Sequence, residues 1–181
     1  MGIDENVMKS LFYNNQNYSL DFMFKRTNYK SVSPGLYEAM LGFSRYLANS
    51  NLERSLLDLV EIRASQLNGC AWCLDMHSKD AMESGESPQR IFLLNAWQES
   101  PQFTHREKMA LKWTEAVTLI SESHITDELF EEVSTEFTEV ELVELTGAVI
   151  SINSWNRANI AFQMIPGDYV SKRKKKASDE D

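Results

Sequence analysis

Two cysteines and a histidine, Cys70, Cys73 and His77, follow one another at intervals of three and four residues. On a helix these positions share one face, so the three side chains point the same way. A thiol in the first turn of a helix is stabilised as a thiolate by free N–H groups and by the helix dipole. An imidazole one turn further on can accept the thiol proton. The spacing therefore predicts a redox-active thiol pair, in which Cys73 is the better activated because His77 lies four residues beyond it.

Other uses of the cysteines fit the sequence less well. A structural zinc site needs a fourth ligand, and the remaining histidines, His105 and His124, lie in a separate part of the chain. A c-type haem needs a histidine directly after the second cysteine, where Leu74 stands. Two buried cysteines that only pack remain an alternative. The residues thus favour thiol chemistry without a metal or other cofactor.

The elements that would position these residues are helices. Apolar residues recur at helical spacing after Ser33-Pro34-Gly35, and residues 52–67 are apolar around most of the helical circumference, as in a buried helix. Asn68-Gly69 ends that helix, and a new one begins near Cys70 and ends before Gly85. Further helix starts are predicted at Ser87-Pro88, Thr104 with Glu107, Thr126, and Thr138 with Glu141. No alternating strand pattern appears, so we predict an all-α fold.

Length and charge limit the class of protein. A chain of 181 residues is typical of a single domain. The net charge of −9 would repel phosphate backbones, which argues against a nucleic-acid partner. No apolar run approaches 18 residues and the N-terminus has no secretory pattern, so we expect a cytoplasmic protein without a membrane partner. We divide the chain into an N-terminal packing arm (1–32), a helical domain (33–167) and a disordered charged tail (168–181).

The segment from Asp58 to His77, with its Asn-Gly-Cys-x-x-Cys-x-x-x-His core, resembles the AhpD-like alkylhydroperoxidases of the carboxymuconolactone decarboxylase superfamily. The likeness continues through Gly85 and through residues 103–107 and 155–157, and it covers roughly residues 35–163. The resemblance implies an all-α helical bundle assembled as a homo-oligomer, a trimer or a hexamer. It also implies thiol-dependent reduction of peroxides.

The resemblance assigns roles to individual residues. It makes Cys73 the thiol that attacks the peroxide and Cys70 the thiol that resolves the product, and His77 takes the place of the proton-relay histidine. The family's relay glutamate stands twelve residues before the first cysteine, where this chain has Asp58. Glu61 lies three residues later and shares a helical face with Asp58. Both are candidates for the relay, and we prefer Asp58.

The relay sets a condition on the fold. In one straight helix Asp58 would lie about 28 Å from His77, at roughly 1.5 Å per residue. The chain must therefore turn back at Asn68-Gly69 for either carboxylate to reach the imidazole.

Taken together, the sequence indicates a thiol-dependent hydroperoxide reductase with an antioxidant role. Its partners would be a hydroperoxide substrate and an external dithiol reductant, lipoyl or thioredoxin-like. One alternative is a non-catalytic oligomeric helical module that senses redox state or only packs. Another is a carboxymuconolactone decarboxylase-type enzyme, although Cys70 and Cys73 argue against it because those enzymes generally lack the paired cysteines.

Overall fold

Helices account for the regular structure of the part of the chain that is described. The computed structural model describes residues 24–122 and 124–173. Within these ranges the only extended pairing is an isolated antiparallel bridge between Phe24 and Met164, and no helix is long and apolar enough to cross a membrane. The helices are α2 (Tyr29–Val32), α3 (Pro34–Ala48), α4 (Arg54–Asn68), α5 (Ala71–Glu83), α6 (Pro88–Leu93), the 3-10 helix η2 (Leu94–Ala96), α7 (His105–Thr118), α8 (Asp127–Ser134) and α9 (Glu139–Ala161). The predicted all-α fold is confirmed.

The helix ends follow the predicted capping signals. Thr104 and Thr138 both form complete capping boxes with the glutamate three residues further on. The Ser87 side chain accepts a hydrogen bond from the backbone of Gln89, and Pro88 occupies the first turn of α6. These local interactions satisfy backbone N–H groups that no helix can satisfy internally, so the boundaries are set by short sequence motifs.

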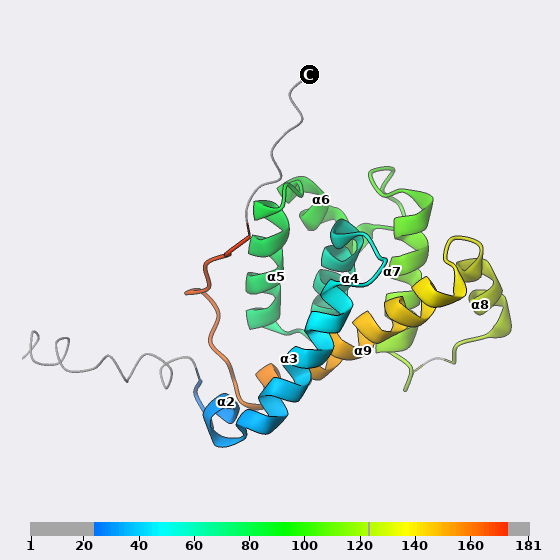
Figure 1. Ribbon diagram of the computed structural model, residues 1–181. Helices are drawn as coiled ribbons and strands as arrows, with labels where there is room; N and C mark the ends of the chain where they lie inside the picture. The colour runs from blue at the N-terminus through cyan, green and yellow to red at the C-terminus, as the bar shows by residue number, and fades with distance from the viewer. Residues whose placement is uncertain (1–23, 123, 174–181) are drawn as a thin grey trace, which may run out of the picture.

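Helix α4 lies at the centre of the bundle. It packs against α5, α7 and α9, which surround it in Figure 1. Leu59 and Val60 are both fully buried and belong to two different core clusters, so α4 is covered on more than one side. The apolar circumference predicted for residues 52–67 is therefore covered within one subunit, and it needs no second copy to shield it.

Helix α3 crosses α9 at the edge of the bundle (Figure 1), and apolar side chains of both helices remain exposed there. A Cβ added at Gly147 of α9 would lie 3.2 Å from Leu47 Cδ2 of α3, so the glycine allows a close approach of the two helices. The exposed apolar side chains of α3 and α9 include Leu36, Phe43, Tyr46, Val140, Val143, Ile150 and Ile160.

The segment after α9 runs along the open side of α5 (orange to red in Figure 1). Tyr169 and Ser171 donate hydrogen bonds from their hydroxyls to Asp80 Oδ1, at 2.8 and 2.5 Å. The Lys79 ammonium donates to the carbonyl of Tyr169 at 3.0 Å. This differs from the expected free tail from residue 168, because the buried Asp80 carboxylate needs partners that this segment supplies. Residues 174–181 lie outside the described ranges.

The described part of the N-terminal arm packs onto the end of α9. Phe24 and Tyr29 are buried with Met164, and Phe162 packs against them. Residues 1–23 of the predicted arm lie outside the described ranges. The arm thus brings α2 to the side of the bundle that carries α5 and the C-terminal half of α9.

Candidate active site

A sharp turn separates α4 from α5 at the predicted position. Helix α4 ends at Asn68, and Gly69 follows in the left-handed conformation with φ 68° and ψ 32°. Glycine adopts this conformation without steric cost. Helix α5 begins at Ala71 and packs back against α4. The condition that the sequence set for a carboxylate–histidine contact is therefore met.

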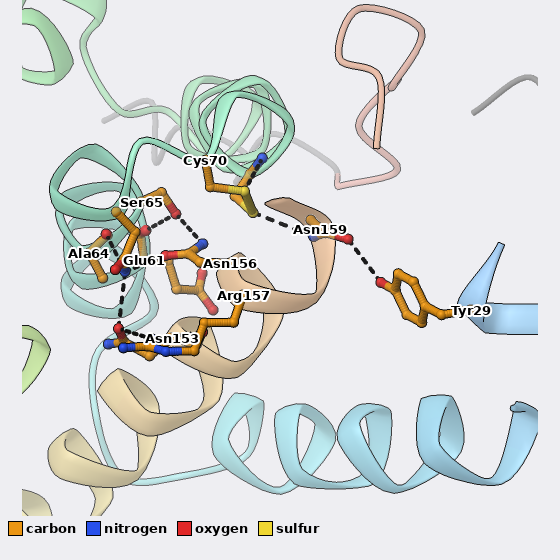
Figure 2. Close-up of a disulfide and its surroundings, with 11 residues drawn as sticks. Tyr29, Glu61, Ala64, Ser65, Cys70, Asn153, Asn156, Arg157 and Asn159 are labelled. Carbon is orange, nitrogen blue, oxygen red and sulfur yellow. Dashed lines mark hydrogen bonds between the residues drawn. A yellow bond between two sulfur atoms is a disulfide. The ribbon is translucent and has the colours of Figure 1, made fainter. Parts of the chain in front are cut away.

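Asparagines of α9 anchor this turn. The Asn68 side-chain amide donates to Asn156 Oδ1 at 2.9 Å and to Asn153 Oδ1 at 3.0 Å. The Asn156 amide in turn donates to Ser65 Oγ at 3.0 Å (Figure 2). Asn156 is fully buried, and a satisfied buried amide holds its neighbours in one arrangement. The start of α5 is thus fixed relative to both α4 and α9.

The two cysteines form a disulfide at the first turn of α5. Cys70 and Cys73 are joined with their Cα atoms 5.3 Å apart. Cys70 is also the N-cap residue of α5, since its sulfur accepts a hydrogen bond from the backbone N–H of Cys73 at 3.4 Å. Both residues are only 1% exposed. The pair lies where free N–H groups and the helix dipole favour a thiolate once the bond is reduced.

A hydrogen-bonded chain reaches the sulfur of Cys73 from two other elements. The side-chain amide of Asn159 donates to Cys73 Sγ at 3.4 Å, and the Tyr29 hydroxyl donates to Asn159 Oδ1 at 2.8 Å (Figure 2). Burial, with a contribution from Tyr37, raises the pKa of Tyr29, so this hydroxyl stays protonated and remains a donor. Because Tyr29 fixes the amide orientation, an N–H group of Asn159 points at the sulfur.

Sequence reasoning missed both Asn159 and Tyr29. The available signal was the recurrence of asparagine at 153, 156 and 159 within an otherwise apolar helix, since buried amides require partners. Tyr29 gave no signal, because its position beside α9 depends on how the arm folds back.

His77 lies beside Glu61. The distance from His77 Nδ1 to Glu61 Oε2 is 3.1 Å, but Nδ1 forms no hydrogen bond of regular geometry with any described residue. Arg54 Nη2 lies 2.5 Å from the same oxygen. Burial alone raises the pKa of the Glu61 carboxyl, but His77, Arg54 and Arg173 outweigh it and lower that pKa to about 2. Glu61 is thus a carboxylate that faces the imidazole.

Asp58, the preferred relay residue, lies one helical turn away from this contact. Its carboxylate is 2% exposed and accepts hydrogen bonds from Arg54 at 2.6 Å and from Arg173 at 2.7 Å. In residues 24–122 and 124–173, no hydrogen bond or ion pair joins Asp58 to His77. The order of preference is corrected on geometry: Glu61 faces the imidazole, and Asp58 holds the arginine that pairs with Glu61.

The hairpin of α4 and α5 explains this placement. Glu61 lies eight residues before Gly69 and His77 lies eight residues after it, so equal rise along two antiparallel helices brings them level. Asp58 and Asp80 each lie eleven residues from the same glycine. These two are level as well, and Arg173 contacts both of them.

One cavity collects the reactive groups. Its volume is about 210 Å³, and Cys73, His77 and Glu61 all line it. The remaining lining includes Lys30, Leu41, Trp72, Met76, Ile152 and Trp155. Cys70 does not line it, so of the two thiols only Cys73 faces this space. In the two described ranges no three histidine, cysteine, aspartate or glutamate side chains converge as metal ligands would.

The all-α hairpin thus places Cys73, His77 and Glu61 around one cavity, with Cys70 bonded to Cys73, and known proteins share this sequence and fold. The carboxymuconolactone decarboxylase family model matches residues 34–116. The uncharacterized protein YdfG of Bacillus subtilis is 40% identical over 139 residues, which cover 77% of this chain and 95% of YdfG. The chain belongs to the carboxymuconolactone decarboxylase family, and it is AhpD-like.

Solved structures extend the likeness. One of them is a protein of unknown function from Agrobacterium tumefaciens, described as a candidate antioxidant defence protein AhpD. It is 38% identical to this chain, with a TM-score of 0.77. The match covers 80% of this chain and 99% of that one. The debrominase Bmp8 shares the fold at 19% identity and a TM-score of 0.70, over 92% of this chain and 90% of its own.

Proposed function

We propose that this protein is a thiol-dependent hydroperoxide reductase. The observation that carries the proposal is the shared cavity, which brings Cys73, His77 and Glu61 to one space that a small substrate can occupy. Fold alone would be a weak argument, since the debrominase Bmp8 has the same fold. The argument therefore rests on the thiol pair and on the groups around it.

The chemistry follows from the placement of these groups. His77 accepts the proton of the Cys73 thiol, and Asn159 together with the first turn of α5 stabilises the thiolate. The thiolate attacks the distal peroxide oxygen, so that the O–O bond breaks, an S–O bond forms, and the alkoxide leaves as the alcohol after taking up a proton. Cys73 is then a sulfenic acid.

The second half of the cycle uses Cys70. Its thiol attacks the sulfenic sulfur, a disulfide forms, and water leaves. An external dithiol supplies two electrons and two protons to reopen the bond, and its own sulfurs become a disulfide. A lipoyl group or a thioredoxin-like protein would serve this step. No metal or other cofactor enters the scheme.

Turnover of cumene hydroperoxide with dithiothreitol tests the proposal. We expect the wild-type chain to reduce the hydroperoxide catalytically and Cys73→Ser to be inactive. Reduced Cys70→Ser, assayed after dithiothreitol has been removed, should consume one equivalent of hydroperoxide and stop as a sulfenic acid. A wild-type protein that reduces the hydroperoxide no faster than Cys73→Ser would contradict the proposal. It would favour the non-catalytic module, in which the thiols sense redox state or pack.

We also expect a homo-oligomer, a trimer or a hexamer as the resemblance implies. Support comes from the edge where α3 crosses α9, because a cluster of large exposed apolar side chains is typical of an interface. A groove lined by Met40, Phe43 and Trp155 lies on the same edge. Sedimentation of the whole chain at micromolar concentration measures the subunit count.

A further inference from the structure

The cavity that holds Cys73 has a second charged group at its wall, which the peroxidase chemistry does not use. Lys30 of α2 lines the same space. Its ammonium lies over three aromatic rings, with the nitrogen 5.7 Å from the ring centre of Phe24, 5.4 Å from that of Tyr37 and 5.6 Å from that of Trp72. Trp72 is the neighbour of Cys73 in the chain, so the cation lies on the thiol's side of the bundle.

The aromatic rings attract the Lys30 ammonium but offer no oxygen acceptor for its N–H groups. Ring faces attract a cation electrostatically, but an ammonium has three N–H donors that seek oxygen acceptors. Among residues 24–122 and 124–173, no carboxylate lies within ion-pair distance of Lys30 Nζ. Lys30 is half-buried, and this partial desolvation of the ammonium lowers its pKa. An anion placed beside it would gain more than it would beside a fully solvated lysine.

The other charged wall of the cavity is already neutralised. Glu61 pairs with Arg54 and faces His77. Between the two walls the lining is mostly apolar, with Leu41, Met76 and Ile152 among its members. The chain as a whole carries a net charge of −9 and does not attract anions in general. A local cation in this setting therefore selects among substrates.

We propose that the cavity takes hydroperoxides that carry a carboxylate, with Lys30 pairing with that carboxylate while the hydroperoxide group reaches Cys73. This inference rests on the proposed peroxidase function and names its substrate class. The apolar lining takes the hydrocarbon between the two polar ends, and the volume of about 210 Å³ calls for a compact molecule. Lys30 is then a specificity-determining residue, and the redox step is unchanged.

A matched pair of substrates tests the inference. The acid is 4-(2-hydroperoxypropan-2-yl)benzoate, and the control is its methyl ester, which has the same hydroperoxide and no charge. With dithiothreitol as reductant we expect kcat/KM to favour the acid by about tenfold, the size of one hydrogen-bonded ion pair that is partly shielded from water. Lys30→Met should bring the ratio of acid to ester close to one. Lys30→Arg, which keeps the charge, should retain a preference for the acid.

Lys25→Met is the control variant, because Lys25 is an exposed lysine five residues away that does not line the cavity. It should keep the wild-type ratio. A wild-type ratio near one, or a preference for the acid that survives in Lys30→Met, would overturn the inference. Should Lys30→Met fail to fold, Lys30→Gln also removes the charge and should bring the ratio of acid to ester close to one.

Binding separates this inference from the peroxidase proposal. The non-reactive acid 4-isopropylbenzoate should quench tryptophan fluorescence, since Trp72 and Trp155 line the cavity, and Lys30→Met should weaken its binding about tenfold. If no hydroperoxide is reduced but this difference in binding is found, the peroxidase proposal fails and the carboxylate site stands. Equal binding by wild type and Lys30→Met would overturn the carboxylate site whatever the catalytic result.

Discussion

Replacing Glu61 with glutamine tests the electrostatic core of the proposed site. The substitution keeps the size of the side chain and removes the charge that lies 3.1 Å from His77 Nδ1. If His77 accepts the thiol proton, it becomes an imidazolium beside this carboxylate. In the variant the His77 imidazolium should therefore be less stable, and the protein should reduce hydroperoxide more slowly.

The size of the loss can be worked from the distance. Two unit charges at this separation interact by about 5 kcal/mol at an effective dielectric constant of roughly 20. Glu61 also pairs with Arg54, and its side chain is 23% exposed. We therefore expect about half of that energy, or roughly 2–3 kcal/mol, to be lost. This corresponds to a decrease of about 30- to 160-fold in kcat/KM for the hydroperoxide.

Asp58→Asn is the matched control, because it removes a carboxylate from the same helix one turn away. Asp58 pairs with Arg54 and Arg173, and its carboxylate makes no hydrogen bond or ion pair with His77. We expect its rate to change by only a few-fold, but the free energy of unfolding to fall by about 2–3 kcal/mol, since a buried ion pair is broken. Stopped-flow oxidation of the reduced protein measures the rate, and urea unfolding measures the free energy of unfolding. Equal rate losses in both variants, or an unchanged rate in Glu61→Gln, would refute the reasoning.

The same residue predicts a dependence of stability on pH. The pKa of Glu61 is lowered from 4.5 to about 2 in the folded chain. A carboxylate with a lowered pKa stabilises the fold above its usual pKa, and the contribution is lost as pH falls from about 4.5 to about 2. The shift corresponds to about 3 kcal/mol. Glu61→Gln should show a shallower loss of stability across this window in urea unfolding.

Three further predictions concern other parts of the structure. Asn159→Ala should slow alkylation of reduced Cys73 by iodoacetamide about fivefold, since a hydrogen bond to the sulfur contributes about 1 kcal/mol; an unchanged rate would mean that the amide does not stabilise the thiolate. Phe43→Glu should shift the sedimenting species toward monomer, because it places a charge on the exposed apolar edge of α3. Gly147→Val should lower the free energy of unfolding by about 1–3 kcal/mol, because even a Cβ there would approach Leu47 to 3.2 Å.

Much of the fold could be predicted because its signals are local. Thr104 and Thr138 mark helix starts through contacts within four residues, and Gly69 marks the turn through its own backbone conformation. These features do not depend on how the helices pack. The Cys70, Cys73 and His77 spacing is local for the same reason, so the chemistry could be proposed before the fold was known.

The choice between the two carboxylates could not be made from helical periodicity alone. Asp58 and Glu61 share a face of α4, and only their distance from the turn decides which of them meets His77. Counting residues outward from Gly69 in both directions would have favoured Glu61. Arg173 could not have been found in this way, because its contact with Asp58 spans 115 residues of sequence.

The burial of the disulfide has a consequence for how electrons enter the molecule. Thiol–disulfide exchange requires an incoming thiolate to approach one sulfur directly, and Cys70 and Cys73 are each 1% exposed. A bulky protein surface cannot make this approach while the first turn of α5 stays folded, whereas a slender dithiol can enter where the substrate does. The reduction rate would then be limited by passage through the cavity for a slender donor, and by the unwinding of one helical turn for a bulky one. Comparing the rates at which a small and a bulky dithiol of equal reduction potential reduce the disulfide would thus measure how often that turn unwinds.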